Sequence, residues 1–350
     1  MGLVCGTTEA GKYYIKRGGK EFMLRSMYSG ISGMKVNQTK LDVIGNNIAN
    51  VSTTAFKGSR AEFKDMLYQN AGYASAPTSN KGGTNAKQVG LGAQLSSINK
   101  LMSQGNAMST GRSLDVCIDG DGYLIVGSGP INAANGVDKD GFTGTNDNGG
   151  LEVLYTRDGN LTLDHQGNLL TADGYRVMGY NVGGALTHDV NDGITAKYVN
   201  ADDKTALTTD GKLVPLAIPD KVGDQPVKTF EIGKDGLITA VLGDGTRSAL
   251  GQIATGSFKN PEGLTAVGGN LLQVSSNSGS TIVRSGLDKT GTDDNSKGFG
   301  DLIQGALEGS NVDLTEQFTD MIVATRAFQA SSKMISNGDE VLQTITGLIR

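Results

Sequence analysis

Apolar side chains recur every seven residues along the C-terminal end of the chain, between residues 313 and 349. The residues at this interval are Leu314, Met321, Phe328, Ile335, Leu342 and Ile349, and Phe318, Ile322 and Ile345 widen the stripe. A repeat of seven predicts a long amphipathic helix with a narrow apolar seam, unlike the broad face of a globular core helix. Asp313 followed by Glu316 has capping-box spacing, which predicts that the helix begins there.

A second stripe of the same kind lies near the N-terminal end. Its residues are Met27, Met34, Leu41 and Ile48, backed by Leu24, Ile31 and Ile44. We expect a helix from about residue 24 to residue 47, because Gly45, Asn46 and Asn47 together favour a helix end or a local break.

One apolar stripe usually packs into an ordinary core. Two stripes at opposite ends of a chain, each set apart by a polar segment, are more typical of association surfaces. The alternative is that the ends are disordered in isolation and fold upon assembly. We therefore predict an assembly seam formed by Leu24, Met27, Ile31, Met34, Leu41, Ile44, Ile48, Leu314, Phe318, Met321, Phe328, Ile335, Leu342 and Ile349.

Between the stripes, short apolar runs with a period of two predict β-strands from about residue 94 onwards. Asp-Gly pairs separate many of these runs and favour tight hairpin turns, because glycine tolerates a positive φ. The pairs begin at Asp121, Asp158, Asp173, Asp210, Asp235 and Asp244. Glycine is also abundant, at 52 of 350 residues, and it disfavours helix interiors. The middle of the chain is therefore expected to be turn-rich β structure.

These patterns predict an α+β multidomain protein in which two coiled-coil-like terminal helices form an inner rod and the middle is all-β. The helical domain would comprise residues 23–70, including a further helical spacing at residues 59–68, together with residues 305–350. Residues 71–93 and 275–304 are predicted to be linkers. Residues 94–180 and 229–274 would form the β domain, with residues 181–228 as a small β-rich outer insertion.

Residues 1–22 do not share the pattern that follows them. We expect a native start at Met23 and interpret residues 1–22 as a non-native extension without a signal peptide.

The composition argues against several function classes. A net charge of −5 provides no basic field for nucleic acid, and no run approaches the ~20 apolar residues of a membrane span. Cys117 is expected to be a small buried hydrophobe. With only two cysteines and two histidines (His165 and His188), the chain has little material for a zinc site or a Ser-His-Asp triad. We predict no enzyme activity and no cofactor.

Two other classes stay open as alternatives. A secreted hydrolase acting on cell-wall glycans would need paired carboxylates in a cleft, whereas most carboxylates here are explained by Asp-Gly turns. A secreted adhesin or binding module displayed by the β body would not need the helical ends.

Several segments resemble the bacterial flagellar axial proteins, the family of rod, hook and hook-associated subunits. Near the N-terminal helix these segments are residues 41–51 (LDVIGNNIANV), residues 54–57 (TAFK) and residues 90–92. In the β body they are residues 115–118 with Gly122 and Tyr123, and residues 155–159 (YTRDG). Towards the C-terminus they are residues 305–314 (GALEGSNVDL), residues 321–324 and residues 326–329.

This resemblance implies a structural subunit that is exported unfolded by the flagellar type III apparatus and polymerises into a helical tube outside the cell. Within the family it favours the hook subunit, a flexible universal joint that transmits torque, because of apparent insertions at residues 130–150 and 181–228. The distal rod subunit is the alternative. The implied partners are copies of the chain itself, the distal rod protein, the hook cap protein and the hook–filament junction protein.

Overall fold

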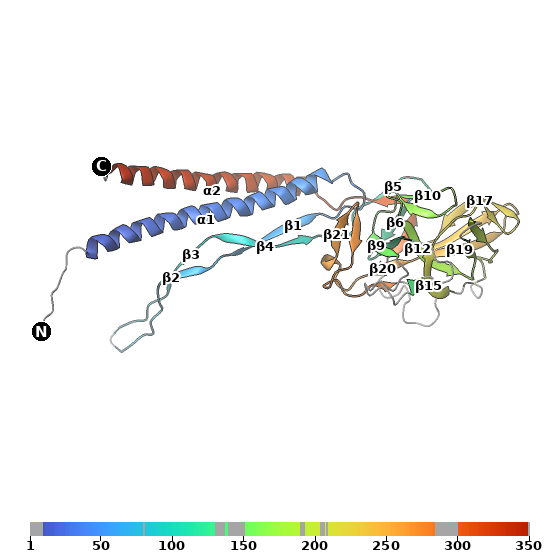
Figure 1. The fold of residues 1–350 in the computed structure, drawn as a ribbon, viewed down its shortest axis with the longest axis horizontal. Helices are drawn as coiled ribbons and strands as arrows, with labels where there is room; N and C mark the ends of the chain where they lie inside the picture. The colour runs from blue at the N-terminus through green and yellow to red at the C-terminus, as the bar shows by residue number, and fades with distance from the viewer. Residues whose placement is uncertain are drawn as a thin grey trace. The chain divides into compact units, whose positions relative to one another are not determined.

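A computed structural model describes residues 10–79, 81–129, 137–138, 151–189, 193–203, 207, 209–283 and 300–348. The chain is mostly β, with a long helix at each end, as predicted (Figure 1). It divides into two compact units. The first, here named the helix–hairpin unit, contains Met1–Val51, Gly58–Leu101 and Val312–Arg350. The second, the β unit, contains Ser52–Lys57 and Met102–Asn311.

Both long helices cover the predicted heptad stripes, but the first begins within residues 1–22 instead of near residue 24. Helix α1 spans Ala10–Ala49, and α2 spans Leu314–Leu348. The Asp313 carboxylate accepts hydrogen bonds from the backbone N–H groups of Thr315 (2.8 Å) and Glu316 (3.4 Å), which confirms Asp313 as the N-cap. Helix α1 continues through Gly45 and Asn46, so the glycine–asparagine cluster does not break it before Ala49.

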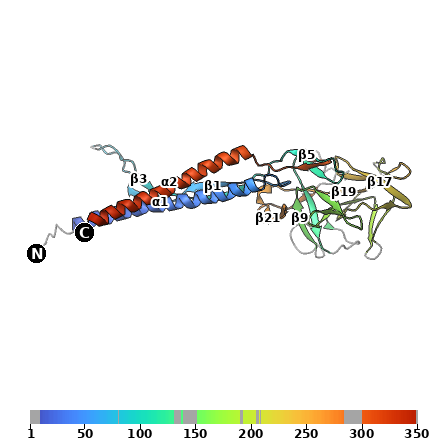
Figure 2. The same cartoon turned by 90° about the horizontal axis from the view of Figure 1, so that it is seen from above.

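The remainder of the helix–hairpin unit is built from two antiparallel strand pairs that follow α1 in sequence (Figures 1 and 2). These strands are β1 (Ser59–Asp65), β2 (Tyr68–Gly72), β3 (Lys87–Gly90) and β4 (Ala93–Lys100). Strands β1 and β4 pack along α1.

Two sequence predictions for this region were wrong. Residues 59–65 form strand β1 rather than a helix, and residues 66 and 67 connect it to β2. The apparent helical spacing came from Phe63, Met66 and Leu67, which span the end of β1 and this connection. Residues 71–93 are likewise not a plain linker, since they contain β3 and the end of β2, and residues 94–101 belong with the helices.

The β unit is built around a network of seventeen connected strands. Strand β12 lies at its centre and pairs with β7, β11, β15 and β19. The first members of the network are β7 (Tyr123–Ser128), β8 (Val137–Asp138), β9 (Glu152–Thr156), β10 (Leu161–Leu163), β11 (Leu169–Thr171), β12 (Arg176–Val182), β13 (Leu186–Asp189), β14 (Gly193–Ala196) and β15 (Thr209–Pro215). The others are β16 (Lys221–Val222), β17 (Gln225–Ile232), β18 (Leu237–Leu242), β19 (Arg247–Ile253), β20 (Thr255–Ser257), β21 (Thr265–Gly268), β22 (Leu271–Gln273) and β23 (Ile282–Val283).

Two further strand pairs and one short helix complete the β unit. The pairs are β6 (Val116–Asp119) with β24 (Asp301–Gln304), and β5 (Ala107–Ser109) with β25 (Ala306–Glu308), and the 3₁₀ helix is Pro261–Gly263. Residues 305–311 were predicted to lie in the helical domain, but β25 places them in the β unit. Residues 275–304 are also more than a linker, since β23 and β24 lie within them. The predicted outer insertion at residues 181–228 is not separated from the rest of this unit.

The Asp-Gly turns were predicted with mixed success. Gly174, Gly236 and Gly245 have positive φ values of 85°, 78° and 83° and close hairpins between consecutive paired strands. Gly211 lies inside β15, so its turn prediction was wrong. The pairs at Asp121 and Asp158 connect strands that do not pair with each other. Three of the six Asp-Gly pairs thus close a hairpin.

The hydrophobic core of the protein lies in the β unit. Tyr155, Tyr180 and Leu124 are among its fully buried side chains. The Tyr155 hydroxyl is hydrogen-bonded to the Thr281 hydroxyl at 2.6 Å, and burial raises the Tyr155 pKa to about 12. Cys117 is completely buried, as its sequence context predicted, and burial raises the pKa of its thiol.

Candidate assembly surface

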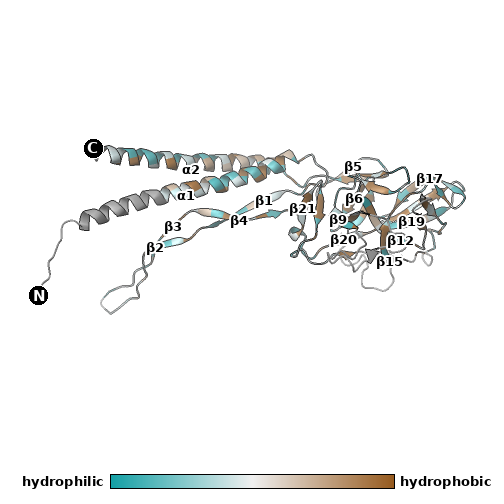
Figure 3. Ribbon diagram, in the orientation of Figure 1, coloured by the Kyte–Doolittle hydropathy of each residue, from teal (hydrophilic) through white to brown (hydrophobic). Residues whose placement is uncertain are grey.

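Exposed apolar side chains are concentrated in the helix–hairpin unit. Of the 24 large hydrophobic residues exposed in the described part of the chain, 18 belong to this unit. Conversely, Ile44 and Ala324 are its only buried hydrophobic residues among those described. Figure 3 shows apolar bands along the full length of α2, interspersed with polar ones. This unit therefore has apolar surface on both helices and the strands but almost no interior.

The helices α1 and α2 pack side by side and antiparallel. A Cβ atom on Gly30 would lie 3.3 Å from Ile335, one on Gly33 would lie 3.1 Å from Ser331, and one on Gly338 would lie 3.2 Å from Met27. These glycines therefore allow the two backbones to approach closely. The sequence stripes did not reveal this contact, because heptad patterns are read from large apolar residues and the glycines carry no side chain.

Asn47 fixes the other end of the helix pair. Its side chain is buried, with only 2% exposed, near the C-terminus of α1. The Asn47 amide nitrogen donates to the Ser59 carbonyl oxygen (2.8 Å) and to the Gln317 side-chain oxygen (3.0 Å), and its own side-chain oxygen accepts the Ser59 N–H (2.9 Å). A more exposed ion pair joins Lys40 to Asp320 at 3.2 Å. Asn47 thus connects α1, β1 and α2.

The predicted seam is only partly buried within this unit. Ile44 is buried, whereas Leu314 and Phe318 are 39% and 49% exposed. The half-buried members are Met27, Met34, Leu41, Ile48, Met321, Phe328, Ile335 and Leu342. Ile31 departs from the helix–helix side and lines a groove elsewhere on α1. The side chains of Leu24 and Ile349 lie outside the described residues.

Two exposed apolar stripes run along α2, one on each flank of its contact with α1. Helical spacing of about 100° per residue places Leu314, Phe318 and Ile322 on one flank. The other flank, here named the flanking stripe, consists of Val323, Met334, Val341, Ile345 and Leu348. The side of α2 that points away from α1 carries Arg326, Lys333 and Glu340. This pattern suits a helix with α1 beneath it and an apolar neighbour on each side.

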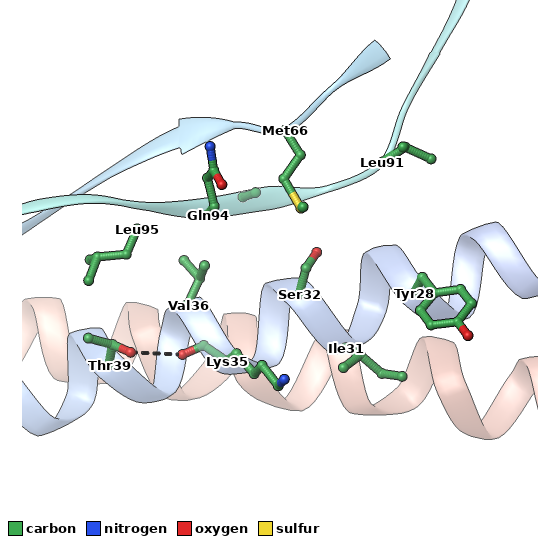
Figure 4. A pocket seen from close by; sticks show the side chains of 11 residues that line it. Tyr28, Ile31, Ser32, Lys35, Val36, Thr39, Met66, Leu91, Gln94 and Leu95 are labelled. Atoms are coloured by element: carbon green, nitrogen blue, oxygen red, sulfur yellow. Dashed lines mark hydrogen bonds between the residues drawn. The ribbon is translucent and has the colours of Figure 1, made fainter. Parts of the chain in front are cut away.

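An apolar groove of about 600 Å³ lies between α1 and the strands (Figure 4). Its walls are formed by Tyr28, Ile31, Ser32, Lys35, Val36 and Thr39 of α1, and by Met66, Leu91, Ala93, Gln94 and Leu95 of the hairpin, the segment from β1 to β4. At about 100° per residue, Tyr28 and Lys35 lie roughly opposite Gly30 and Gly33, so the groove and α2 occupy opposite sides of α1.

A buried charge cluster was missed by the sequence analysis and lies in the β unit. The Glu308 carboxylate, whose side chain is 0% exposed, accepts from the Lys57 ammonium (2.7 Å), the Arg157 guanidinium (3.1 Å) and the Gly105 N–H (2.8 Å). Arg157 also donates to the carbonyl oxygens of Gly120 and Gly122. Burial lowers the pKa of Lys57, while the adjacent Glu308 carboxylate acts in the opposite direction.

This charge cluster holds together segments that are distant in sequence. Lys57 precedes β1, Arg157 follows β9, and Glu308 ends β25. The Ala55 N–H also donates to the Glu308 carbonyl oxygen at 2.8 Å, with Ala55 at a positive φ of 54°. All three charged residues lie within the segments that carry the family resemblance, which was the only sequence signal that could have indicated them.

Asp158 lies next to the same cluster in sequence. Its carboxylate accepts a hydrogen bond from the Thr54 hydroxyl at 3.1 Å and from the Asn160 N–H at 3.2 Å. Burial raises the pKa of Asp158 above its usual value, although both hydrogen bonds oppose the shift. Ionisation of this carboxylate is therefore less favourable in the folded β unit than in a solvent-exposed aspartate.

The described residues contain no group of three or more His, Cys, Asp or Glu side chains placed to hold a metal ion. Neither helix, over its described length, is apolar enough to cross a membrane. His165 is exposed in the connection between β10 and β11, and His188 lies in β13, with its side chain outside the described residues.

Three family models match the chain. Residues 27–57 match the flagella basal body rod protein model, residues 136–240 match the D1 domain of the flagellar hook protein FlgE/F/G, and residues 303–348 match the C-terminal model of the flagellar basal body rod FlgEFG proteins. The flagellar basal-body rod protein FlgG of Bacillus subtilis is 42% identical, with 94% of this chain and 100% of that protein covered. The chain belongs to the FlgE/F/G family of flagellar rod and hook proteins. It is therefore related to structural components of the flagellum and not to an enzyme family.

Both branches of the family are similar to the chain. The flagellar hook protein FlgE of Borreliella burgdorferi is 31% identical, and its alignment covers 93% of this chain and 100% of that protein. The rod protein FlgG of the same organism is 30% identical over 94% of this chain and 100% of its own length. Identity alone therefore does not separate rod from hook.

The first prediction concerns the buried charge cluster. We expect Glu308→Ala to lower the free energy of unfolding by about 3–5 kcal/mol, because it leaves two buried cations without their carboxylate. Urea unfolding followed by circular dichroism measures the change. The matched control is Glu231→Ala, which removes an exposed partner of Arg247 at 3.8 Å and should change stability by less than ~1 kcal/mol. Equal effects of the two exchanges would contradict a structural role for the cluster.

The second prediction concerns the pH dependence of stability at Asp158. A raised pKa in the folded state means that the folded protein binds this proton more tightly than the unfolded chain, so stability decreases as pH rises from the unfolded pKa through the folded one. Asp158→Asn removes this penalty and keeps an acceptor for Thr54. We expect its stability relative to the parent protein to increase between pH 3 and pH 7. Asp244→Asn, in an exposed turn, controls for the loss of one charge. A relative stability that decreases with pH would refute the assignment.

Proposed function

We propose that this chain is a structural subunit that polymerises with copies of itself to form part of the flagellar rod–hook tube. The observation that carries the proposal is the concentration of exposed apolar side chains on the helix–hairpin unit, which has almost no buried core. Apolar surface of this extent marks an association site rather than a solvated face. Polymerisation would bury it and complete the core of this unit.

The arrangement of this surface supports an open polymer. The two stripes on α2 differ in sequence and lie on different flanks of the helix, so a neighbour on one side meets a different surface from a neighbour on the other. Contacts between unlike surfaces produce rings or helical filaments, whereas a closed dimer uses one surface twice. The predicted seam residues would take part in these contacts, with packing as their only chemistry.

Comparison of lengths supports the rod segment of the tube. The alignment with the B. subtilis rod protein runs over 328 residues. The alignments with the hook proteins of B. burgdorferi and Treponema pallidum run over 451 and 472 residues, although they use 93% and 94% of this chain. Both hook proteins therefore carry long insertions that this chain lacks.

The hook subunit, which the sequence analysis favoured, is the second candidate. The similarity to hook FlgE is no weaker than that to the rod FlgG of the same organism. One of the two segments interpreted as hook insertions, residues 181–228, forms part of the β network, and most of the other lies outside the described residues. In either position, the chain would be exported by the type III export apparatus. Its proposed partners are the distal rod protein, the hook cap protein and the hook–filament junction protein. The hook position would lie outside the cell.

Electron microscopy of flagella from a strain that lacks the gene separates these positions. We expect basal bodies that lack the distal end of the rod and carry no hook. Complete rods without hooks would assign the chain to the hook instead. Normal flagella on the deletion strain would contradict both positions.

The next prediction tests self-assembly on one flank of α2. The double exchange Phe318→Ser and Ile322→Ser removes two exposed apolar side chains, each of which would contribute about 1.5–3 kcal/mol when buried. We expect the critical concentration for polymerisation to rise by roughly 100-fold or more, while the unfolding midpoint of the monomer changes little. Sedimentation measures the critical concentration, and urea unfolding measures the midpoint.

The control variant is Val267→Ser, which removes a side chain that is 57% exposed on β21 in the β unit. It should polymerise like the parent protein. A double variant that assembles normally would show that this flank is not an interface.

A further inference from the structure

The groove between α1 and the hairpin has apolar walls that the chain's own residues leave partly uncovered. Tyr28 is 66% exposed, while Ile31, Met66 and Leu95 are 36–38% exposed. The groove residues come from α1 and the hairpin alone, with none from α2. A volume of about 600 Å³ has room for several side chains but not for a second helix backbone. An occupant must therefore insert a ridge of side chains from outside.

The part of the flanking stripe from Met334 to Ile345 forms a ridge of suitable length and chemistry. Met334, Val341 and Ile345 are 53%, 48% and 39% exposed. Met334 and Ile345 are as far apart along α2 as Tyr28 and Thr39 are along α1, about 16 Å in each case at 1.5 Å per residue. Ridge and groove therefore match in length, and both are apolar.

The two surfaces cannot meet within one molecule. Gly30 and Gly33 hold α2 against one side of α1, whereas the groove opens on the opposite side. A contact between ridge and groove thus requires two copies, and the resulting pair retains one free groove and one free ridge. Such a head-to-tail contact can repeat without limit.

We infer that the flanking stripe of α2 in one copy inserts into the α1–hairpin groove of the next copy. This inference rests on the proposed self-assembly and specifies one of its contacts. Met334 and Val341 are the central ridge residues, and Met66 and Leu95 form the hairpin wall that receives them. The contact would cover the apolar groove of every subunit in the polymer except the terminal one.

Complementation between two variants of the full chain tests the pairing. A ridge variant carries Met334→Lys and Val341→Lys, and a groove variant carries Met66→Lys and Leu95→Lys. Each variant alone lacks one half of the contact and should remain monomeric at concentrations at which the parent protein polymerises. A mixture retains one intact groove and one intact ridge, so we expect a 1:1 complex that does not grow, measured by analytical ultracentrifugation.

A matched control carries Asn337→Lys and Thr344→Lys, which add the same charges at exposed positions on the polar side of α2 that carries Arg326 and Lys333. It should polymerise like the parent protein. Circular dichroism of all variants should show unchanged helix content, because every exchanged side chain is partly or wholly exposed.

The outcomes separate this inference from the proposed function. If the parent protein polymerises but the ridge and groove variants do so equally well, or their mixture forms no complex, the pairing is wrong and self-assembly stands. If the parent protein itself never polymerises, the proposed function fails and this inference fails with it. An additional disulfide between Met66→Cys and Met334→Cys, formed only between copies on a Cys5→Ser background, would locate the contact directly.

Discussion

The architecture depends on a shortage of interior in the helix–hairpin unit. Helix α1 contacts α2 on one side and the β1–β4 pair on the other, and among the described residues of this unit no further element packs against the outer faces of α2 or the strands. The two outer layers therefore bury only one side each, which explains why Ile44 and Ala324 are its only buried hydrophobic residues among those described. Since burial of apolar area is the main stabilising contribution to folding, this unit gains most by acquiring neighbours.

The β unit, in contrast, forms a buried core from its own residues. Its core contains large buried side chains such as Tyr155 and Tyr180, and the Glu308 cluster fixes segments from both ends of the chain within it. Buried ion clusters often contribute little net stability relative to apolar packing, but removing one member is costly. Glu308 therefore acts chiefly as a constraint on chain arrangement. It holds Lys57 and Arg157 together, and Glu308 itself lies a few residues before the start of α2 at Leu314.

The sequence predicted elements with strong periodicity and missed contacts made by small or charged residues. The stripes at Leu314 and Met27 located both long helices because a seven-residue repeat extends over many turns. The strand at residues 59–65 was mistaken for a helix because the apolar residues Phe63, Met66 and Leu67 continue past its end into the connection to β2. Gly30, Gly33 and Asn47 have no signature in a hydrophobic pattern, since their roles depend on which segment lies opposite. The same holds for Glu308, whose two charged partners are 251 and 151 residues away.

The distribution of glycine and polar residues on the helices gives assembly a direction. Gly30, Gly33 and Gly338 bring α1 and α2 into close contact, so the pair behaves as one element with defined sides. Arg326 and Lys333 keep the far side of α2 polar, which leaves only its two flanks for apolar contacts. A subunit that can be approached on two unlike flanks adds neighbours in a fixed orientation and leaves one side facing water. A hollow tube has the same requirements, because its wall subunits need lateral neighbours and a hydrated surface.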